Sequence, residues 1–123
     1  MTAEPRIVIA GAGSVGCYVG GCLALAGRRT IMLARLRLVG AMTRDGLRIT
    51  DLEGRDRFLA PDRLSVTDDP AMALAKADIV LVTVKSGATG DMAALIDRYA
   101  PTRAVVVSLQ NGVENAQRLY EAM

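Results

Sequence analysis

The feature that most constrains this chain is a glycine pattern near its N-terminus. The apolar run Ile7-Val8-Ile9 leads into Gly11, Gly13 and Gly16, which have the spacing G-x-G-x-x-G. In a strand–turn–helix unit the first glycine allows the tight turn, the second lets a pyrophosphate approach the backbone, and the third lets the helix pack closely on the strand. The pattern predicts a dinucleotide-binding loop, and an ordinary glycine turn is the alternative. The expected contacts are Gly11, Ala12, Gly13, Ser14, Val15 and Gly16.

The residues after the second predicted strand indicate which dinucleotide the loop would hold. Binders of NAD place a carboxylate about 20 residues beyond the glycines, where it contacts the ribose 2′-hydroxyl. Here the strand is followed by Arg35 and Arg37, and no Asp or Glu occurs between Pro5 and Arg44. A guanidinium can bind a 2′-phosphate that a carboxylate would repel. The sequence therefore favours NADP(H) with Arg35 as a contact, and solvated loop arginines are the other interpretation.

Composition indicates one globular domain and argues against several function classes. The 123 residues are 51% hydrophobic, which suits a single core, and the net charge is only +2. Because the chain has three tyrosines, one phenylalanine and no tryptophan, it offers little for stacking on bases, and we expect no nucleic-acid partner. Cys17 and Cys22 lie five apart on one predicted helix, where they cannot pair, and read as small core residues.

Metal and membrane functions are also not expected. The chain has no histidine and only two cysteines, so no transition-metal site is predicted. The apolar stretch at 15–26 is too short to span a bilayer, and the first residues lack the features of a signal peptide. These observations predict a cytoplasmic protein without a membrane partner.

Strand and helix signals alternate along the whole chain. Two apolar, β-branched runs, at 79–84 and 104–109, show no polar alternation and are typical of strands buried on both faces. The alternation predicts an α/β fold, a Rossmann-type doubly wound and mostly parallel sheet, with residues 1–123 forming one dinucleotide-binding domain. The predicted strands are 6–10, 30–34, 64–67, 79–84 and 104–109, and the predicted helices are 14–26, 38–44, 70–76, 89–99 and 113–122.

One segment departs from this alternation. Two short strand-like runs, at 47–50 and 57–60, flank a glycine turn at Glu53-Gly54 and predict a β-hairpin inserted after the second helix.

Two further polar side chains follow predicted strands at the edge where ligands bind in such sheets. Lys85 follows the run at 79–84, and Asn111 follows the run at 104–109. Ligands of open α/β sheets lie beyond the carboxyl ends of the strands. Lys85 could therefore carry charge to a ribose or phosphate, and the Asn111 amide could orient a carboxamide or hydroxyl. A solvated lysine and a simple Asn-Gly turn are the alternatives.

With these positions together, the sequence resembles the N-terminal domain of the ketopantoate reductases (2-dehydropantoate 2-reductases). The matching motifs occur in order and cover essentially the whole chain: GAGSVG at 11–16, LARLRLVGAMTRDGLRI at 33–49, VTVKS at 82–86 and LQNGVEN at 109–115. The two later motifs and the hairpin distinguish this pattern from Rossmann domains in general. The resemblance implies an oxidoreductase that reduces 2-dehydropantoate, a small 2-keto acid, with NADP(H) in pantothenate biosynthesis.

The resemblance also implies roles for individual residues. Lys85 and Asn111 would bind the nicotinamide end of the cofactor, Asn111 would also lie near the substrate, and Arg35 would face the 2′-phosphate. In the family a second, helical domain supplies the proton-donating lysine and much of the substrate pocket. That domain is expected to be absent from residues 1–123, so no catalytic residue is assigned here. A stand-alone nucleotide-sensing module and a reductase of another 2-keto acid are the alternatives, and the oligomeric state stays open between monomer and homodimer.

Overall fold

The computed structural model describes residues 4–50, 54 and 56–110, apart from the side chains of Ser14 and Ser86. The predicted helix at 113–122 lies outside this range. The elements in chain order are β1 (Ile7–Ala10), α1 (Ser14–Leu25), β2 (Thr30–Leu33), α2 (Leu36–Asp45), β3 (Leu47–Thr50), β4 (Asp56–Leu59), the 3₁₀ turn η1 (Pro61–Arg63), β5 (Val66–Thr67), α3 (Pro70–Leu74), β6 (Ile79–Val82), the 3₁₀ turn η2 (Ser86–Ala88), α4 (Thr89–Tyr99) and β7 (Val105–Ser108).

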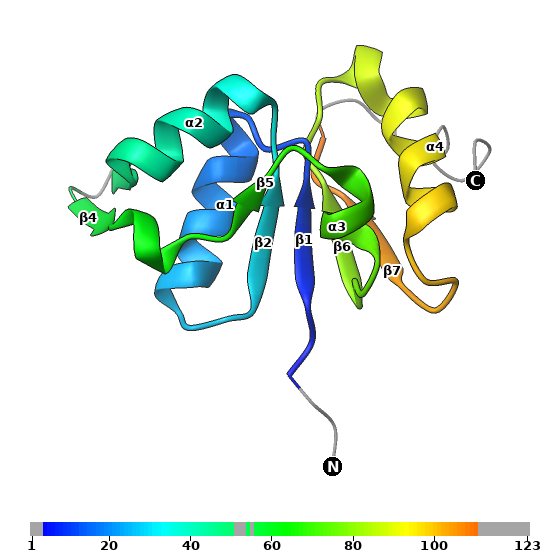
Figure 1. The fold of residues 1–123 in the computed structure, drawn as a ribbon, viewed down its shortest axis with the longest axis horizontal. Helices are drawn as coiled ribbons and strands as arrows, with labels where there is room; N and C mark the ends of the chain where they lie inside the picture. Colours follow the sequence, from blue (N-terminus) through cyan, green and yellow to red (C-terminus); the bar gives the residue numbers. More distant parts are fainter. Residues whose placement is uncertain (1–3, 51–53, 55, 111–123) are drawn as a thin grey trace.

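The main sheet is parallel and doubly wound, as the sequence predicts. Its strand order is β5-β2-β1-β6-β7, and each neighbouring pair is parallel. The chain builds outward from β1 to β2 and β5, then returns to the other side of β1 with β6 and β7 (Figure 1). The order therefore reverses at β1, and the carboxyl ends of β1, β2 and β6 lie next to one another there. Such reversal points are where open α/β sheets bind ligands.

Helices cover both faces of this sheet and define two halves of the core. On one face, α1 and α2 pack over a cluster that includes Ile9 and Met32, which are 0% and 1% exposed. On the other face, α3 and α4 pack over a cluster that includes Val80 and Val82. In α4, Met92 and Ile96 are buried, and Leu95 and Tyr99 pack against the same cluster, so one apolar stripe of the helix faces the sheet. Each face thus buries its own side-chain set, as the alternation of side chains along a strand requires.

The prediction of burial on both faces is wrong for β7. Val105 and Val107 are 58% and 39% exposed, whereas Val106, which points to the opposite face, packs against the core. The physical reason is position: β7 is the outer strand of the described sheet, and the helices described on that face lie over the other strands. The apolar run therefore marks a strand correctly, but it does not reveal that one face of that strand lacks a covering helix in the described part of the chain.

The inserted hairpin is confirmed and packs against α1. Strands β3 and β4 are antiparallel, with Leu47 opposite Leu59. A side chain on Gly21 of α1 would overlap Ile49 of β3, so this glycine lets the hairpin approach the helix closely. The predicted turn residue Glu53 lies outside the described residues.

Candidate functional site: a dinucleotide-binding edge

Three loops meet at the carboxyl edge of the sheet, where the strand order reverses. The backbone N–H groups of Gly11 and Ala12 both donate to the Leu33 carbonyl at the end of β2, each at 2.9 Å. On the other side, the Thr83 N–H donates to the Ala10 carbonyl at 3.0 Å. The loop after β1 is therefore tied to the ends of β2 and β6, and the sequence-predicted positions around Gly11, Arg35 and Lys85 are brought to one edge.

The structure confirms the packing roles predicted for two glycines of the motif, Gly11 and Gly16, and leaves open space beside the third, Gly13. Gly11 has a φ of +85°, a conformation that favours glycine, and a side chain there would overlap Val84. A Cβ on Gly16 would lie 2.6 Å from Thr83 Oγ1 and 3.0 Å from Ile9 Cγ2, so this glycine permits close helix–sheet packing. A Cβ on Gly13 would meet no atom within 4 Å. The space beside Gly13 is open, which is the room that a pyrophosphate at this backbone needs.

The start of α1 fits an anionic group as well. The helix has no acidic residue in its first turn, and Gly13 at its N-cap contributes no side chain. The first N–H groups of a helix lack partners within the helix, and its dipole favours negative charge at this end. Of the other residues of the predicted loop, Ala12 is buried and Val15 is half exposed. Ser14 is the first residue of the helix, and the structure does not describe its side chain. The residues present thus fit a dinucleotide pyrophosphate.

The start of α2 forms the next part of this edge. Arg35 is the N-cap of the helix, and Arg37 lies in its first turn, because α2 begins at Leu36 rather than at the predicted residue 38. Both arginines are exposed, and neither forms an ion pair within the described part of the chain. The second strand therefore ends at two available guanidinium groups and a helix N-terminus, without a carboxylate in the first turn of α2.

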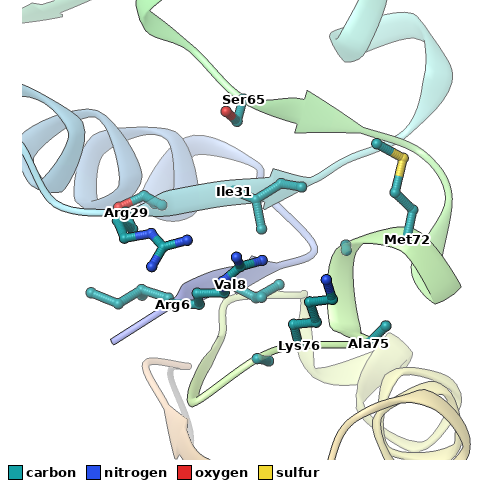
Figure 2. A pocket seen from close by; sticks show the side chains of 12 residues that line it. Arg6, Val8, Arg29, Ile31, Ser65, Met72, Ala75 and Lys76 are labelled. Carbon is teal, nitrogen blue, oxygen red and sulfur yellow. The ribbon is translucent and has the colours of Figure 1, made fainter. Parts of the chain in front are cut away.

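A separate hollow of about 510 Å³ lies at the opposite edge, beside the amino ends of β1 and β2 (Figure 2). It contains none of the predicted site residues.

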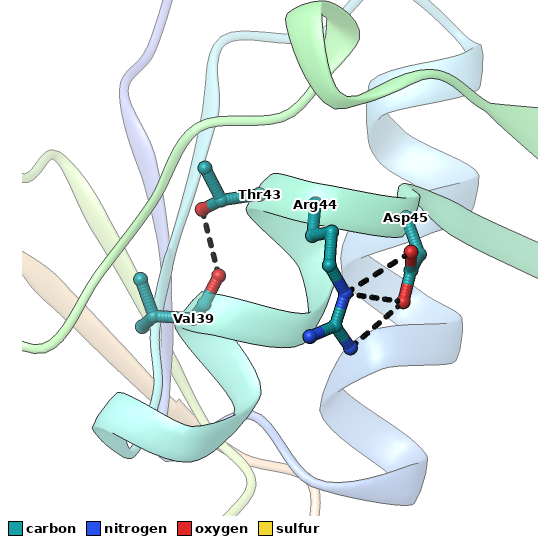
Figure 3. A network of polar contacts seen from close by, with 4 residues as sticks. All are labelled: Val39, Thr43, Arg44 and Asp45. Atoms are coloured by element: carbon teal, nitrogen blue, oxygen red, sulfur yellow. Dashed lines mark hydrogen bonds and ion pairs between the residues drawn. The ribbon is translucent and has the colours of Figure 1, made fainter.

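At the C-terminal end of α2, Arg44 differs from Arg35 and Arg37 because it is bonded to a carboxylate. Arg44 donates from Nε and Nη2 to the Asp45 carboxylate at 3.0–3.2 Å, and Thr43 Oγ1 donates to the Val39 carbonyl at 2.7 Å (Figure 3). This hydrogen bonding with Asp45 raises the pKa of Arg44. Arg44 is therefore a natural comparison for Arg35. Arg35 is the N-cap of α2 and Arg44 lies in its last turn, and of the two only Arg44 has a carboxylate partner among the residues that the structure describes.

Two residues that the sequence analysis gave no role connect the loops. Thr83 Oγ1 donates to the Ala10 and Gly11 carbonyls at 3.3 and 3.2 Å. Gln110 Nε2 donates to the Val84 carbonyl at 2.9 Å and to Thr89 Oγ1 at 2.8 Å. Gln110 thus joins the chain after β7 to the turn that carries Lys85 and to the buried start of α4. Only the position of Gln110 just after a strand could have suggested this from sequence.

The remaining predicted residues lie beside this network. Lys85 is exposed, directly before η2, and its carbonyl accepts from the Ala88 N–H at 2.8 Å. Asn111 lies outside the described residues. The prediction that both cysteines are core residues is wrong for Cys22, which is exposed, whereas Cys17 is partly buried and burial raises the pKa of its thiol. Among the residues described, no group of three or more potential metal ligands occurs and no helix is long and apolar enough to cross a bilayer.

Comparisons with known proteins agree with this geometry. Residues 7–123 match the family described as ketopantoate reductase PanE/ApbA. The 2-dehydropantoate 2-reductase of Halobacterium salinarum is 39% identical, with the match covering 94% of this chain and 37% of that protein. The enzyme of the same name from Pyrococcus horikoshii is 35% identical, covering 94% and 36%.

Solved structures give the same result. The crystal structure of a PanE/ApbA family ketopantoate reductase from Ralstonia eutropha superposes with a TM-score of 0.84 at 40% identity, covering 94% of this chain and 37% of that one. The chain thus spans somewhat more than a third of the length of these relatives. The fold, the glycine loop and these matches agree. The chain belongs to the ketopantoate reductase family, a family of NAD(P)-dependent oxidoreductases.

Proposed function

We propose that the protein reduces 2-dehydropantoate to pantoate with NADPH, and that residues 1–123 hold the cofactor. The observation that carries the cofactor role is the loop geometry: side chains or sheet atoms fill the space beside Gly11 and Gly16, whereas the space beside Gly13 is open. Membership of the ketopantoate reductase family supports the reaction. The compartment that goes with this proposal is the cytoplasm.

The charges at the edge support NADPH as the cofactor. Arg35 and Arg37 stand at the N-terminus of α2 with no carboxylate partner among the described residues. A 2′-phosphate at this place would receive a charge-assisted hydrogen bond from Arg35 and would lie in the favourable field of the helix dipole. In NAD binders, by contrast, a carboxylate occupies the end of the second strand.

The chain's own residues would prepare the cofactor for reaction. The N–H groups at the start of α1 hold the pyrophosphate, and Lys85 with Asn111 orient the nicotinamide end. When bound, NADPH supplies the hydride for the keto carbon. Reduction of a ketone also requires a proton for the developing alkoxide. We assign no proton donor among the described residues, and of residues 1–123 Asn111 is the one proposed to lie near the substrate.

Calorimetric titration with NADPH and NADH tests the cofactor assignment. We expect tighter binding of NADPH, and Arg35→Ala should weaken NADPH binding by about 1.5–3 kcal/mol, the range for a hydrogen bond to a charged group, with little effect on NADH. The matched control is Arg44→Ala on the same helix, which should change neither affinity. Equal affinities of the unaltered chain for the two cofactors would overturn the NADPH assignment.

The substrate assignment needs a separate measurement. Oxidation of NADPH should depend on added 2-dehydropantoate when the proton-donating and substrate-binding groups are present. Residues 1–123 by themselves should bind NADPH but turn over far below the usual enzymatic range of about 1–10³ per second. Turnover by this segment within that range would show that it contains a proton donor that we have not assigned.

A further inference from the structure

The open hollow at the amino edge of the sheet combines cationic side chains with apolar surface. It lies beside the starts of β1 and β2 and the residues that follow α3, and it measures about 510 Å³, within the range of small-molecule sites. We call it the amino-edge pocket. Its lining includes Arg6, Arg29 and Lys76 together with Ile31, Met72 and Ala73.

The apolar part of the pocket comes from β2 and from α3. The helix α3 has only five residues, Pro70–Leu74. Ile31 of β2 is only partly buried on the face that α3 covers. Met72 is 67% exposed at the side of the hollow. The walls therefore include apolar surface that a ligand could cover.

The charges around the pocket are all of one sign. The lining includes Arg6, Arg29 and Lys76 but no carboxylate, and Figure 2 shows the nitrogen-bearing ends of the three side chains beside the same hollow. None of the three forms a side-chain ion pair in the described part of the chain. Cations that share one site repel one another, and an anion between them removes that repulsion.

Two carboxylates close in sequence to these cations have partners of their own. Glu4 pairs with Arg28 at 3.6 Å. Asp78 accepts from the Arg6 backbone N–H at 2.8 Å and pairs with Arg103 Nη2 at 3.4 Å. Neither carboxylate forms an ion pair with Arg6, Arg29 or Lys76 in the described part of the chain.

We propose that the amino-edge pocket binds a small organic anion that carries two negative charges and a short apolar body. The guanidinium groups of Arg6 and Arg29 suit a phosphate or carboxylate, which they can hold through paired hydrogen bonds, and Lys76 adds a point charge. Ile31 and Met72 provide the apolar contact. Val8, the lining residue farthest along β1, precedes Gly11 by three residues, or roughly 10 Å at about 3.3 Å per residue. The pocket and the glycine loop therefore lie towards opposite ends of the strand, and both sites can be occupied at once.

Phenyl phosphate is a suitable probe, because it combines a dianion with one apolar ring. In ¹⁵N–¹H NMR spectra of the chain, we expect saturable shifts at the residues around Arg6, Ile31 and Lys76. Inorganic phosphate should bind the same place about tenfold more weakly, since it lacks the ring, and neutral benzyl alcohol should cause no saturable shift. Shifts confined to the glycine loop, or no saturable shift with phenyl phosphate, would overturn the proposal.

Substitutions distinguish binding in the amino-edge pocket from non-specific attraction of an anion to a basic surface. The combined variant Arg29→Gln and Lys76→Gln should weaken phenyl phosphate binding by at least about tenfold, because two of the three charges are removed. The matched control is Arg63→Gln, an exposed arginine on η1 outside the pocket. Well-dispersed spectra would verify that each variant is folded. Unchanged binding by the double variant, or equal weakening by Arg63→Gln, would overturn the proposal.

Discussion

Placing the same side chain at two glycines of one loop should give opposite results. In Gly13→Val the new atoms enter a space with no protein atom within 4 Å of the Cβ position. Valine is a poorer N-cap than glycine, so we expect a loss of only about 1 kcal/mol in the free energy of unfolding. In Gly16→Val the Cβ would already lie 2.6 Å from Thr83 Oγ1 and 3.0 Å from Ile9 Cγ2. Overpacking of this kind costs about 3 kcal/mol or more when further methyl groups follow.

The effect on the cofactor should be the reverse of the effect on folding. The methyl groups of Gly13→Val would keep the pyrophosphate from the N–H groups at the start of α1. Loss of two charge-assisted hydrogen bonds corresponds to about 3–6 kcal/mol, which is more than 100-fold in affinity. Urea unfolding followed by circular dichroism gives the stability, and calorimetry gives the affinity for NADPH.

Each of the two variants has a result that would contradict the prediction made for it. If folded Gly13→Val binds NADPH within about threefold of the unaltered chain, which is less than 1 kcal/mol, the pyrophosphate does not lie at this loop. If Gly16→Val is as stable as the unaltered chain, the tight packing of α1 on the sheet is not a constraint, and the reasoning from the Cβ distances is refuted.

Three further predictions concern the hydrogen bonds of Gln110, the burial of Cys17 and the ion pair of Arg48 with Asp56. Gln110→Leu should lower the free energy of unfolding by about 1–3 kcal/mol in urea titrations, because the Val84 carbonyl and the Thr89 hydroxyl each lose the hydrogen bond that Gln110 donates. It should also weaken NADPH binding, and an unchanged affinity would show that this residue does not position the neighbouring turn. With a thiol-alkylating reagent followed by mass spectrometry, Cys22 should react faster than Cys17, whose thiol pKa is raised by burial; equal rates would contradict this order. Hydrogen bonding to Arg48 lowers the pKa of Asp56 in the folded chain. Any stabilisation from this pair is therefore present above about pH 4, the usual carboxyl pKa, and is lost as the pH falls through the lowered value. In Arg48→Ala, NMR titration should show the pKa of Asp56 rising towards the usual value.

The sequence by itself was sufficient for features that depend on neighbouring residues. The glycine spacing, the apolar runs and the hairpin each arise from local backbone geometry and side-chain periodicity, and all three are present in the structure. The start of α3 also has a local cause, because Asp69 directly precedes Pro70 in the sequence and its carboxylate accepts from the Ala71 and Met72 N–H groups. Errors at element ends were small, such as the start of α2 at Leu36 instead of residue 38.

Tertiary structure alone decided which distant residues meet. Thr83 bonds to the Gly11 carbonyl across 72 positions, and Gln110 bonds to Thr89 across 21. Neither contact has a local signal, because a hydroxyl or an amide can find partners wherever the chain brings them. The exposure of Val107 and the gathering of Arg29 with Lys76 have the same origin. Strand order determines which face stays uncovered and which charges share an edge, and strand order is a property of the whole fold.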